Sequence, residues 1–335
     1  MINAVKRTLH SLKCFSYYNW KITDVPYPPR YLQIETTSHC NLKCPMCFHS
    51  FKAKKRVDGY MSLALYRKII DEVKDYIFRV SLHHRGEPLL HSQLGTMIKM
   101  ASERGVKTNI HTNATLLTKK KSEELLESGL DEMHFSFDGE DKNTFEKMRR
   151  PANYERTLEN IVNFLKLKKK YKTSKPRVEI QVLKPYTSIR ESNKGLRHIF
   201  RGLPVDVFST GILFNSGGDF KKEIETKIVT PRSSYAPCNT IWSDAVIDWD
   251  GKVPACCRDY DNDYVLGNVK DAPFLEIWNN EKMRDLRKRL IERRYKEIDL
   301  CRDCDALWTL KYEQGLSKKI LARFVRLLRI MREND

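Results

Sequence analysis

The feature that most constrains the fold is a regular alternation, starting at Tyr31, of short β-rich runs with segments of helical period. In the segments 63–77 and 154–170, apolar residues recur three and four positions apart, which is typical of amphipathic helices. Repeats of this kind build a parallel sheet covered by helices. The six predicted strands are YLQIETT (31–37), RVSLHH (79–84), KTNIHTN (107–113), EMHFSF (132–137), RVEIQVL (177–183) and VDVFST (205–210). Six units predict an α/β fold, a partial (β/α)6 barrel, with functional groups at the carboxyl ends of its strands.

Three cysteines follow the first predicted strand in one loop. Cys40, Cys44 and Cys47 stand in a C-x3-C-x2-C spacing, which is short enough to offer three thiolates to three corners of one iron–sulfur cube. The fourth iron would then have no protein ligand and could bind a small chelating molecule. The alternative is a zinc site completed by His39 or His49, although the first cysteine gap is wider than most zinc knuckles use.

A second cysteine group is drawn from distant segments. Cys238, Cys256, Cys301 and Cys304 are enough to ligate a metal centre completely. A closed cluster is suited to relaying electrons or to holding a small domain together, and a structural zinc is the rival interpretation. Cys257 could replace Cys256 as a ligand, could be an inert core residue or could donate a hydrogen atom.

Together these motifs resemble the radical S-adenosylmethionine (SAM) family. The resemblance implies a TIM-like partial barrel and a 4Fe-4S cluster with an open iron, at which SAM is cleaved reductively to a 5′-deoxyadenosyl radical. RGEP after the second strand resembles the G-G-E-P element of the family, with Arg85 in place of the first glycine, and FSFDG after the fourth strand resembles its S-x-D-G element. The SAM contacts that the resemblance implies are Met46, Gly86, Glu87, Asn113 and Ser136.

The C-terminal third is similar to a second family, the SPASM auxiliary domain. PCNTIWSDAVIDWDGKVPACC is followed by LGNV, LEIW and CRDC in the order of that domain, but Leu310 stands where a further cysteine would fall. The spacing therefore resembles the shortened twitch arrangement, which implies one auxiliary 4Fe-4S cluster. It is also similar to that of a family member that oxidises a cyclitol.

The predicted organisation has five parts. They are an N-terminal extension (1–30), the barrel (31–210), a linker (211–237), the SPASM/twitch-like domain (238–312) and a basic amphipathic helix (313–335) that could contact a membrane surface or an acidic partner. The balance of 61 Lys and Arg against 43 Asp and Glu gives a net charge of +18, which favours anionic partners. The absence of an apolar run of roughly 18 residues and of a signal sequence predicts a cytoplasmic protein.

The expected function is oxidation of a sugar or cyclitol alcohol to a ketone, with the auxiliary cluster as electron acceptor and a flavodoxin or ferredoxin as electron donor. The alternatives are a radical epimerase or a peptide-modifying maturase, for which the segment before the first strand is short, and a zinc-containing nucleic-acid binder. The sequence does not contain the repeated spacing of zinc-finger ligands that is typical of such a nucleic-acid binder. His83, His84, His111 and His134 are candidate proton acceptors, and since neighbouring strand residues face opposite sides, at most one of the first two should point inward.

Overall fold

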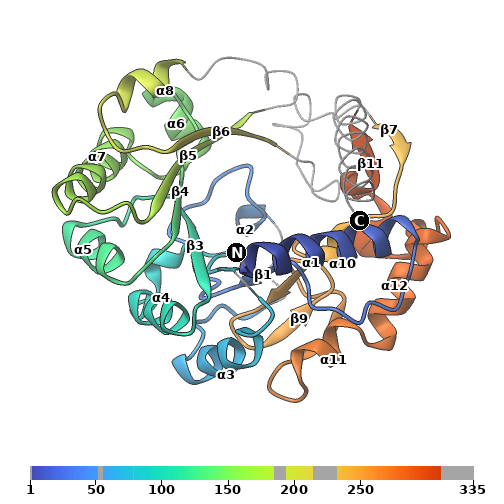
Figure 1. Ribbon diagram of the computed structural model, residues 1–335. Helices are drawn as coiled ribbons and strands as arrows, with labels where there is room; N and C mark the ends of the chain where they lie inside the picture. The colour runs from blue at the N-terminus through green and yellow to red at the C-terminus, as the bar shows by residue number, and fades with distance from the viewer. Residues whose placement is uncertain (1, 52–55, 78, 185–193, 214–231, 311–335) are drawn as a thin grey trace, which may run out of the picture.

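The computed structural model describes residues 2–51, 56–77, 79–184, 194–213 and 232–310, and within them a seven-stranded parallel sheet organises the protein (Figure 1). The order of the strands in this sheet is β6-β5-β4-β3-β2-β1-β8. Helices lie along its outer side, so the sheet forms the partial barrel that the alternating pattern predicted. The strands are β1 (Tyr31–Ile34), β2 (Arg79–Ser81), β3 (Lys107–Thr112), β4 (Glu132–Ser136), β5 (Arg177–Lys184), β6 (Val207–Ile212) and β8 (Asp244–Ile247).

The barrel helices begin at side chains that cap them. Ser62, Thr118, Asp141 and Asn153 each accept a hydrogen bond from a backbone N–H in the first turn of the helix that follows. The helices are α3 (Leu63–Val73), α4 (Leu94–Glu103), α5 (Lys119–Glu127), α6 (Lys142–Met148), α7 (Tyr154–Lys170) and α8 (Lys194–Ile199); a short α2 (Phe48–Phe51) and a 3-10 turn η1 (Pro88–Leu90) follow β1 and β2.

The two faces of the sheet differ in chemistry. Every second residue along the strands is fully buried and apolar and packs against the helices. Examples are Leu32, Val80, Ile110, Met133 and Ile180. The positions between them face the inside of the barrel, where they are polar and partly accessible. They include Ser81, His111, His134, Glu179 and Gln181. The interior of this barrel is therefore a polar surface and not an apolar core.

The sheet does not end at the boundary predicted for the second domain. β8 lies inside the segment 238–312, yet it pairs in parallel with β1 in the register Tyr31↔Asp244 to Ile34↔Ile247. The SPASM/twitch-like segment thus continues the barrel sheet at its β1 edge. Its other elements are β9 (Lys252–Pro254) paired with β10 (Val265–Asn268), strand β11 (Trp308–Leu310), and helices α10 (Thr240–Ser243), α11 (Phe274–Trp278), α12 (Glu281–Ile291) and α13 (Asp299–Arg302). β11 pairs with β7 (Arg232–Tyr235), a strand that lies within the segment 211–237 predicted as a linker.

The N-terminal segment is bound to the same domain. Helix α1 (Ile2–Asn19) runs past α10, and the Tyr18 hydroxyl donates to the carbonyl of Pro237. The buried guanidinium of Arg287 donates to the carbonyls of Thr23 and Ile241, which holds the chain after α1 against α12. The predicted basic helix over 313–335 lies outside the described residues. None of the helices in the described ranges is long and apolar enough to cross a lipid bilayer.

Candidate functional site

The loop after β1 places three thiols at the carboxyl end of the sheet. Cys44 is buried, while Cys40 and Cys47 are partly accessible. The amide of Cys47 donates to the carbonyl of Cys44, and the amide of Leu42 donates to the Cys40 sulfur, so a tight turn presents the sulfurs. Burial raises the pKa of Cys40 to about 12 and raises the pKa values of Cys44 and Cys47 as well.

Arg149, which the sequence analysis did not single out, lies behind this loop. Its guanidinium pairs with the buried carboxylate of Asp138 and hydrogen-bonds the Cys44 thiol. Asp138 also accepts a hydrogen bond from the amide of Leu183 in β5. The FSFDG turn therefore holds a cation against a candidate ligand, and Asp141, three residues further on, caps α6.

The RGEP segment packs against the same loop. A Cβ on Gly86 would lie 2.2 Å from the carbonyl oxygen of Thr37 and 2.6 Å from that of His39, so this position requires glycine for the backbone of the protein itself. Glu87 is 3% exposed, and its carboxylate accepts hydrogen bonds from the amides of Leu89 and Asn113 and from the Thr112 hydroxyl. Burial raises the pKa of Glu87.

The remaining predicted SAM contacts are near one another at the strand ends. The side-chain Nδ2 of Asn113 donates to the Asn41 side chain in the cysteine loop, and its Oδ1 accepts a hydrogen bond from the backbone amide of Thr115, so Asn113 also forms a turn. Ser136 ends β4 and is partly accessible, and Met46 is buried beside the cysteines. The five predicted contacts therefore surround one loop at one end of the barrel.

The second cysteine group lies in a single pocket of the auxiliary domain. Cys238, Cys256, Cys301 and Cys304 line it together, and so does Cys257. Cys301 is in α13 and Cys304 follows that helix, whereas the other three flank β8 and β9. Burial raises the pKa of each of the thiols of Cys256, Cys257, Cys301 and Cys304, that of Cys257 to about 12.

Arg258 is the counterpart of Arg149 in this pocket. Its Nη1 donates to the sulfur of Cys304 at 3.5 Å and forms an ion pair with Asp305. None of the nine cysteines, all of which fall in described ranges, forms a disulfide. Clustered, buried thiols of raised pKa fit metal ligation, because a bound metal takes the deprotonated sulfur and compensates its charge. Both cysteine sets therefore fit the clusters that the sequence predicted.

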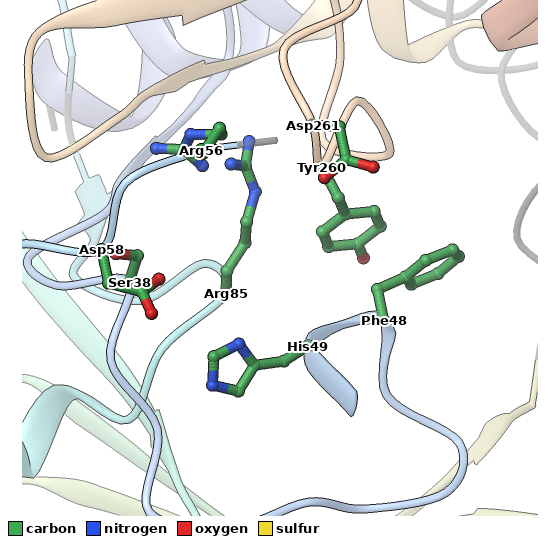
Figure 2. Close-up of a pocket in the computed structure, with 8 residues that line it drawn as sticks. All are labelled: Ser38, Phe48, His49, Arg56, Asp58, Arg85, Tyr260 and Asp261. Atoms are coloured by element: carbon green, nitrogen blue, oxygen red, sulfur yellow. The ribbon is translucent and has the colours of Figure 1, made fainter. Parts of the chain in front are cut away.

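A pocket lies where the barrel and the auxiliary domain meet (Figure 2). Phe48, next to Cys47, stacks on Tyr260 of the auxiliary domain with ring centroids 4.1 Å apart, so the two domains meet at an aromatic pair. The other residues that line the pocket are Ser38, His49, Arg56, Asp58, Arg85 and Asp261. The site thus has an opening bounded by both halves of the protein.

Arg85 explains why the RGEP motif departs from its family pattern. Its Nη2 lies 2.8 Å from the carbonyl of Asp259 and 3.3 Å from the Asp248 carboxylate, both in the auxiliary domain. Arg56 donates to Glu35 at 2.8 Å and lies 3.3 Å from Asp248. Burial and the nearby Glu35 raise the pKa of Asp248 well above its usual value. Arg85 therefore ties the β2 loop to the second domain.

The four candidate histidines divide between two places. His83, His111 and His134 stack inside the barrel, whereas the His84 Nε2–H donates to the carbonyl of Cys257 at 2.9 Å. One atom each of Glu35, His84 and Asp248 lies within 4.8 Å of the others, which is close enough for a metal. Arg56 and Arg85 already compensate the two carboxylates, however, so we interpret this group as an ion-pair network. Of the two adjacent histidines, only His83 faces the barrel interior, as expected.

A partial barrel with a three-cysteine loop at its mouth and a four-cysteine pocket beside it defines an iron–sulfur enzyme that activates a small molecule at an open metal. Residues 34–174 match the Radical SAM superfamily, and residues 238–305 match SPASM, an iron-sulfur cluster-binding domain. The chain therefore belongs to the radical SAM superfamily and carries a SPASM domain.

Similar proteins span most of the chain. The S-adenosyl-L-methionine-dependent 2-deoxy-scyllo-inosamine dehydrogenase of Niallia circulans is 26% identical over 84% of this chain and 95% of its own. A tungsten-containing aldehyde ferredoxin oxidoreductase cofactor-modifying protein of Pyrococcus furiosus is 26% identical over 76% of this chain and 82% of its own.

Solved structures share the fold. BtrN in complex with AdoMet and 2-DOIA matches with a TM-score of 0.56 at 23% identity, over 83% of this chain and 93% of that one. Streptococcus suis SuiB bound to the precursor peptide SuiA matches with a TM-score of 0.62 at 18% identity, over 83% of this chain and 70% of that one.

Proposed function

We propose that this protein is a radical SAM dehydrogenase that oxidises a secondary alcohol of a sugar or cyclitol to a ketone. The observation on which the proposal rests is the enclosed pocket in which four cysteines from distant segments meet, beside an open three-cysteine loop. A cluster ligated at every iron has no position for substrate, so it is suited to accept the electron that alcohol oxidation releases.

The ligands follow from the placement of the thiols. Cys40, Cys44 and Cys47 would hold a 4Fe-4S cluster with one open iron, and Cys238, Cys256, Cys301 and Cys304 an auxiliary 4Fe-4S cluster. Ser136, Asn113 and Met46 border the first loop and are proposed to contact SAM. Gly86 and Glu87 shape that site through their own backbone and carboxylate contacts, which adds a structural role to the one proposed for them.

The chemistry supplied by the bound SAM cluster is abstraction of a hydrogen atom from the carbinol carbon. The protein must then remove the hydroxyl proton, transmit one electron to the auxiliary cluster and exclude water. The Phe48–Tyr260 pair and the Arg85 contacts join the two halves beside the pocket, which supports restricted access of water there.

A polyhydroxylated substrate is supported by two features. The interior face of the strands is polar, with serine, histidine and carboxamide groups that can donate and accept hydrogen bonds. In addition, the 2-deoxy-scyllo-inosamine dehydrogenase matches this chain along nearly its whole length. We propose a flavodoxin or ferredoxin as electron donor, which the net charge of +18 would attract, and a cytoplasmic location.

The test uses anaerobically reconstituted protein with SAM, a strong reductant and a panel of sugars and cyclitols. We expect 5′-deoxyadenosine together with a product lighter by two hydrogen atoms. Failure of every alcohol to yield a ketone, despite SAM cleavage, would overturn the proposed dehydrogenation.

Two alternatives have distinct outcomes in the same assay. A radical epimerase would return a product of unchanged mass that carries solvent deuterium in deuterium oxide. A peptide-modifying activity would require a peptide substrate, and the likeness to peptide-bound SuiB and to PqqA peptide cyclases is the observation that favours it. Zinc in place of iron after anaerobic purification would favour the nucleic-acid binder.

A further inference from the structure

Three histidines form a continuous stack inside the barrel. The ring centroids of His83 and His111 are 4.1 Å apart and those of His111 and His134 are 4.2 Å apart, with interplanar angles of 24° and 12°. His111 and His134 are register partners in β3 and β4, and His134 is the partner of Glu179 in β5. The stack thus occupies one layer of the polar interior, one layer below Ser136.

The His134 end of the stack lies between two carboxylates. Its Nδ1 is 3.4 Å from Glu179 Oε2, and its Nε2 is 3.6 Å from Glu132 Oε2. Glu179 accepts a hydrogen bond from the Ser209 hydroxyl of β6, and Glu132 pairs with Arg79 of β2 at 2.7 Å. Nδ1 of His83, at the opposite end, and Nδ1 of His134 are both buried without a hydrogen-bond partner among the described residues, but only that of His134 has a carboxylate nearby.

The surroundings of the stack disfavour a proton on His83 and on His111. Burial, and repulsion from the other imidazoles, lower the pKa of His83 well below its usual value, and burial together with His134 and Arg79 lowers the pKa of His111 to about 3. Each ring nitrogen of His134 lies within ion-pair distance of a carboxylate oxygen, whereas no such ion pair joins His83 or His111 to a carboxylate among the described residues. The other charged groups that face Glu132 are Arg79 and Arg177. The hydrogen bond with His134, together with these two arginines, lowers the pKa of Glu132.

We propose that His134, between Glu132 and Glu179, accepts the proton of the oxidised hydroxyl group, while His83 and His111 stack beside it as neutral rings. This proposal rests on the dehydrogenase function proposed above. In the balanced step the carbinol hydrogen atom goes to the 5′-deoxyadenosyl radical, the hydroxyl proton goes to His134, and one electron goes to the auxiliary cluster as the C=O bond forms.

The structure also contains an exit for that proton. Glu132 lines a cavity at the amino ends of the strands together with Tyr31, Arg79 and Lys107. The cavity is on the side of the barrel away from the cysteine loop, since β1 to β4 begin there and the loop follows the end of β1. The pair His134–Glu132 therefore connects the barrel interior to a separate opening, so the proton need not pass the radical site.

The first measurement follows His134→Gln, with His198→Gln on the exposed part of α8 as the matched control. We expect His134→Gln to lower ketone formation about 100-fold at neutral pH, the usual size of a lost acid–base group, while iron content and SAM cleavage without substrate stay as in the wild type. Its remaining activity should rise with pH, because hydroxide replaces the lost acceptor, and imidazole should partly restore His134→Ala. Unchanged ketone formation and pH profile in His134→Gln would overturn the proposal.

A second measurement does not depend on turnover. Nitrogen NMR of the ¹⁵N-histidine-labelled protein should show one interior imidazole that takes up a proton while two stay neutral, and His134→Gln should remove that signal. Protonation of His83 or His111 first, or of none of the three between pH 5 and 8, where histidine charge changes usually fall, would contradict the inference even if alcohol oxidation itself holds. If instead no alcohol is oxidised but the single proton is seen on His134, the proposed function fails and the stack keeps its electrostatic assignment.

Discussion

The two cysteine sites are assembled differently, one from a single loop and the other from separate segments of the chain. Cys40, Cys44 and Cys47 come from one loop, in which the amide of Cys47 donates to the carbonyl of Cys44. The auxiliary set comes from three separate segments, at Cys238, Cys256 and Cys301–Cys304, so the pairing of β8 with β1 and the packing of α13 must form before the thiols meet. A local site can assemble early, whereas the dispersed one depends on the completed fold.

The two sites also differ in the number of thiols that they offer to a cluster and in the residues around those thiols. The loop has three thiols at the mouth of the barrel, beside a pocket that both domains line. The auxiliary pocket has a full set of thiols and apolar neighbours such as Leu286, Leu290 and Leu307. Each site has one arginine in contact with a cysteine, Arg149 with Cys44 and Arg258 with Cys304. The comparison predicts an open reactive centre and a closed electron acceptor that can be disabled separately.

The largest expected effect separates the two centres by ligand removal. Cys44→Ala should abolish both 5′-deoxyadenosine and ketone formation. Cys304→Ala should keep SAM cleavage within about tenfold of the wild type but lower the ketone more than about 100-fold, beyond the range seen for outer-shell residues. Iron content and product analysis by mass spectrometry measure both.

Cys14→Ala is the control for thiol loss, because Cys14 is buried in the N-terminal segment away from both sets. It should change neither product. Loss of SAM cleavage in Cys304→Ala, with normal iron at the first site, would mean that the two centres do not act separately.

A smaller effect is expected from a methyl group at two glycines. Gly86→Ala places a Cβ against two backbone oxygens that cannot move without the cysteine loop, which should cost about 3 kcal/mol of stability and weaken SAM binding. Gly251→Ala in the auxiliary domain meets a positive φ of 89° and the Asn268 side chain, and should cost about 1–2 kcal/mol without weakening SAM binding. Denaturant unfolding and SAM titration test this, and equal SAM affinity in the two variants would contradict it.

The part of this molecule that could be predicted from its sequence is the part with local signals. The strand periodicity gave the barrel, with β6 observed at Val207–Ile212 for the predicted 205–210, because alternation and helical spacing depend on neighbours in the chain. The cysteine loop was visible for the same reason. Helix α7 was predicted with its observed bounds, since Asn153 caps it and the lysines end it.

The part that could not be predicted depends on contacts between distant strands. The stacking of His83, His111 and His134 follows from strand register, which a single sequence does not specify between βα units. No sequence motif marks Arg149 or Arg258. Their contacts with the sulfurs of Cys44 and Cys304 form only in the folded chain. Gly86 was assigned to SAM approach, whereas the close approach in the structure is to the backbone of Thr37 and His39. A departure from a family pattern, as at Arg85, was the one available signal for the interdomain ion pairs.

A still smaller effect, a shift in the reduction potential of one cluster, should distinguish the two arginines. Loss of a cation beside a cluster sulfur makes reduction harder, so Arg258→Met should lower the potential of the auxiliary cluster and Arg149→Met that of the SAM-binding cluster. A hydrogen bond worth about 1.4 kcal/mol corresponds to about 60 mV for one electron. Arg258→Lys keeps the charge and should shift less. Potentiometric EPR measures each cluster, and a shift of both potentials by either variant would remove the distinction between the sites.

The smallest effect is expected at Cys257, the fifth thiol of the auxiliary pocket. Four sulfurs already complete a cluster, and the carbonyl of Cys257 has a separate role as acceptor for His84. Cys257→Ser should therefore leave iron content, the EPR signal and ketone formation close to the wild type, while Cys256→Ser loses auxiliary iron. If Cys257→Ser loses the iron and Cys256→Ser keeps it, the two neighbours exchange roles, and the closed site remains closed with a different fourth ligand. If Cys257→Ser keeps the iron but loses solvent deuterium from an epimerised product, Cys257 is a hydrogen donor, and the pocket is not the purely electron-accepting site that the comparison predicts.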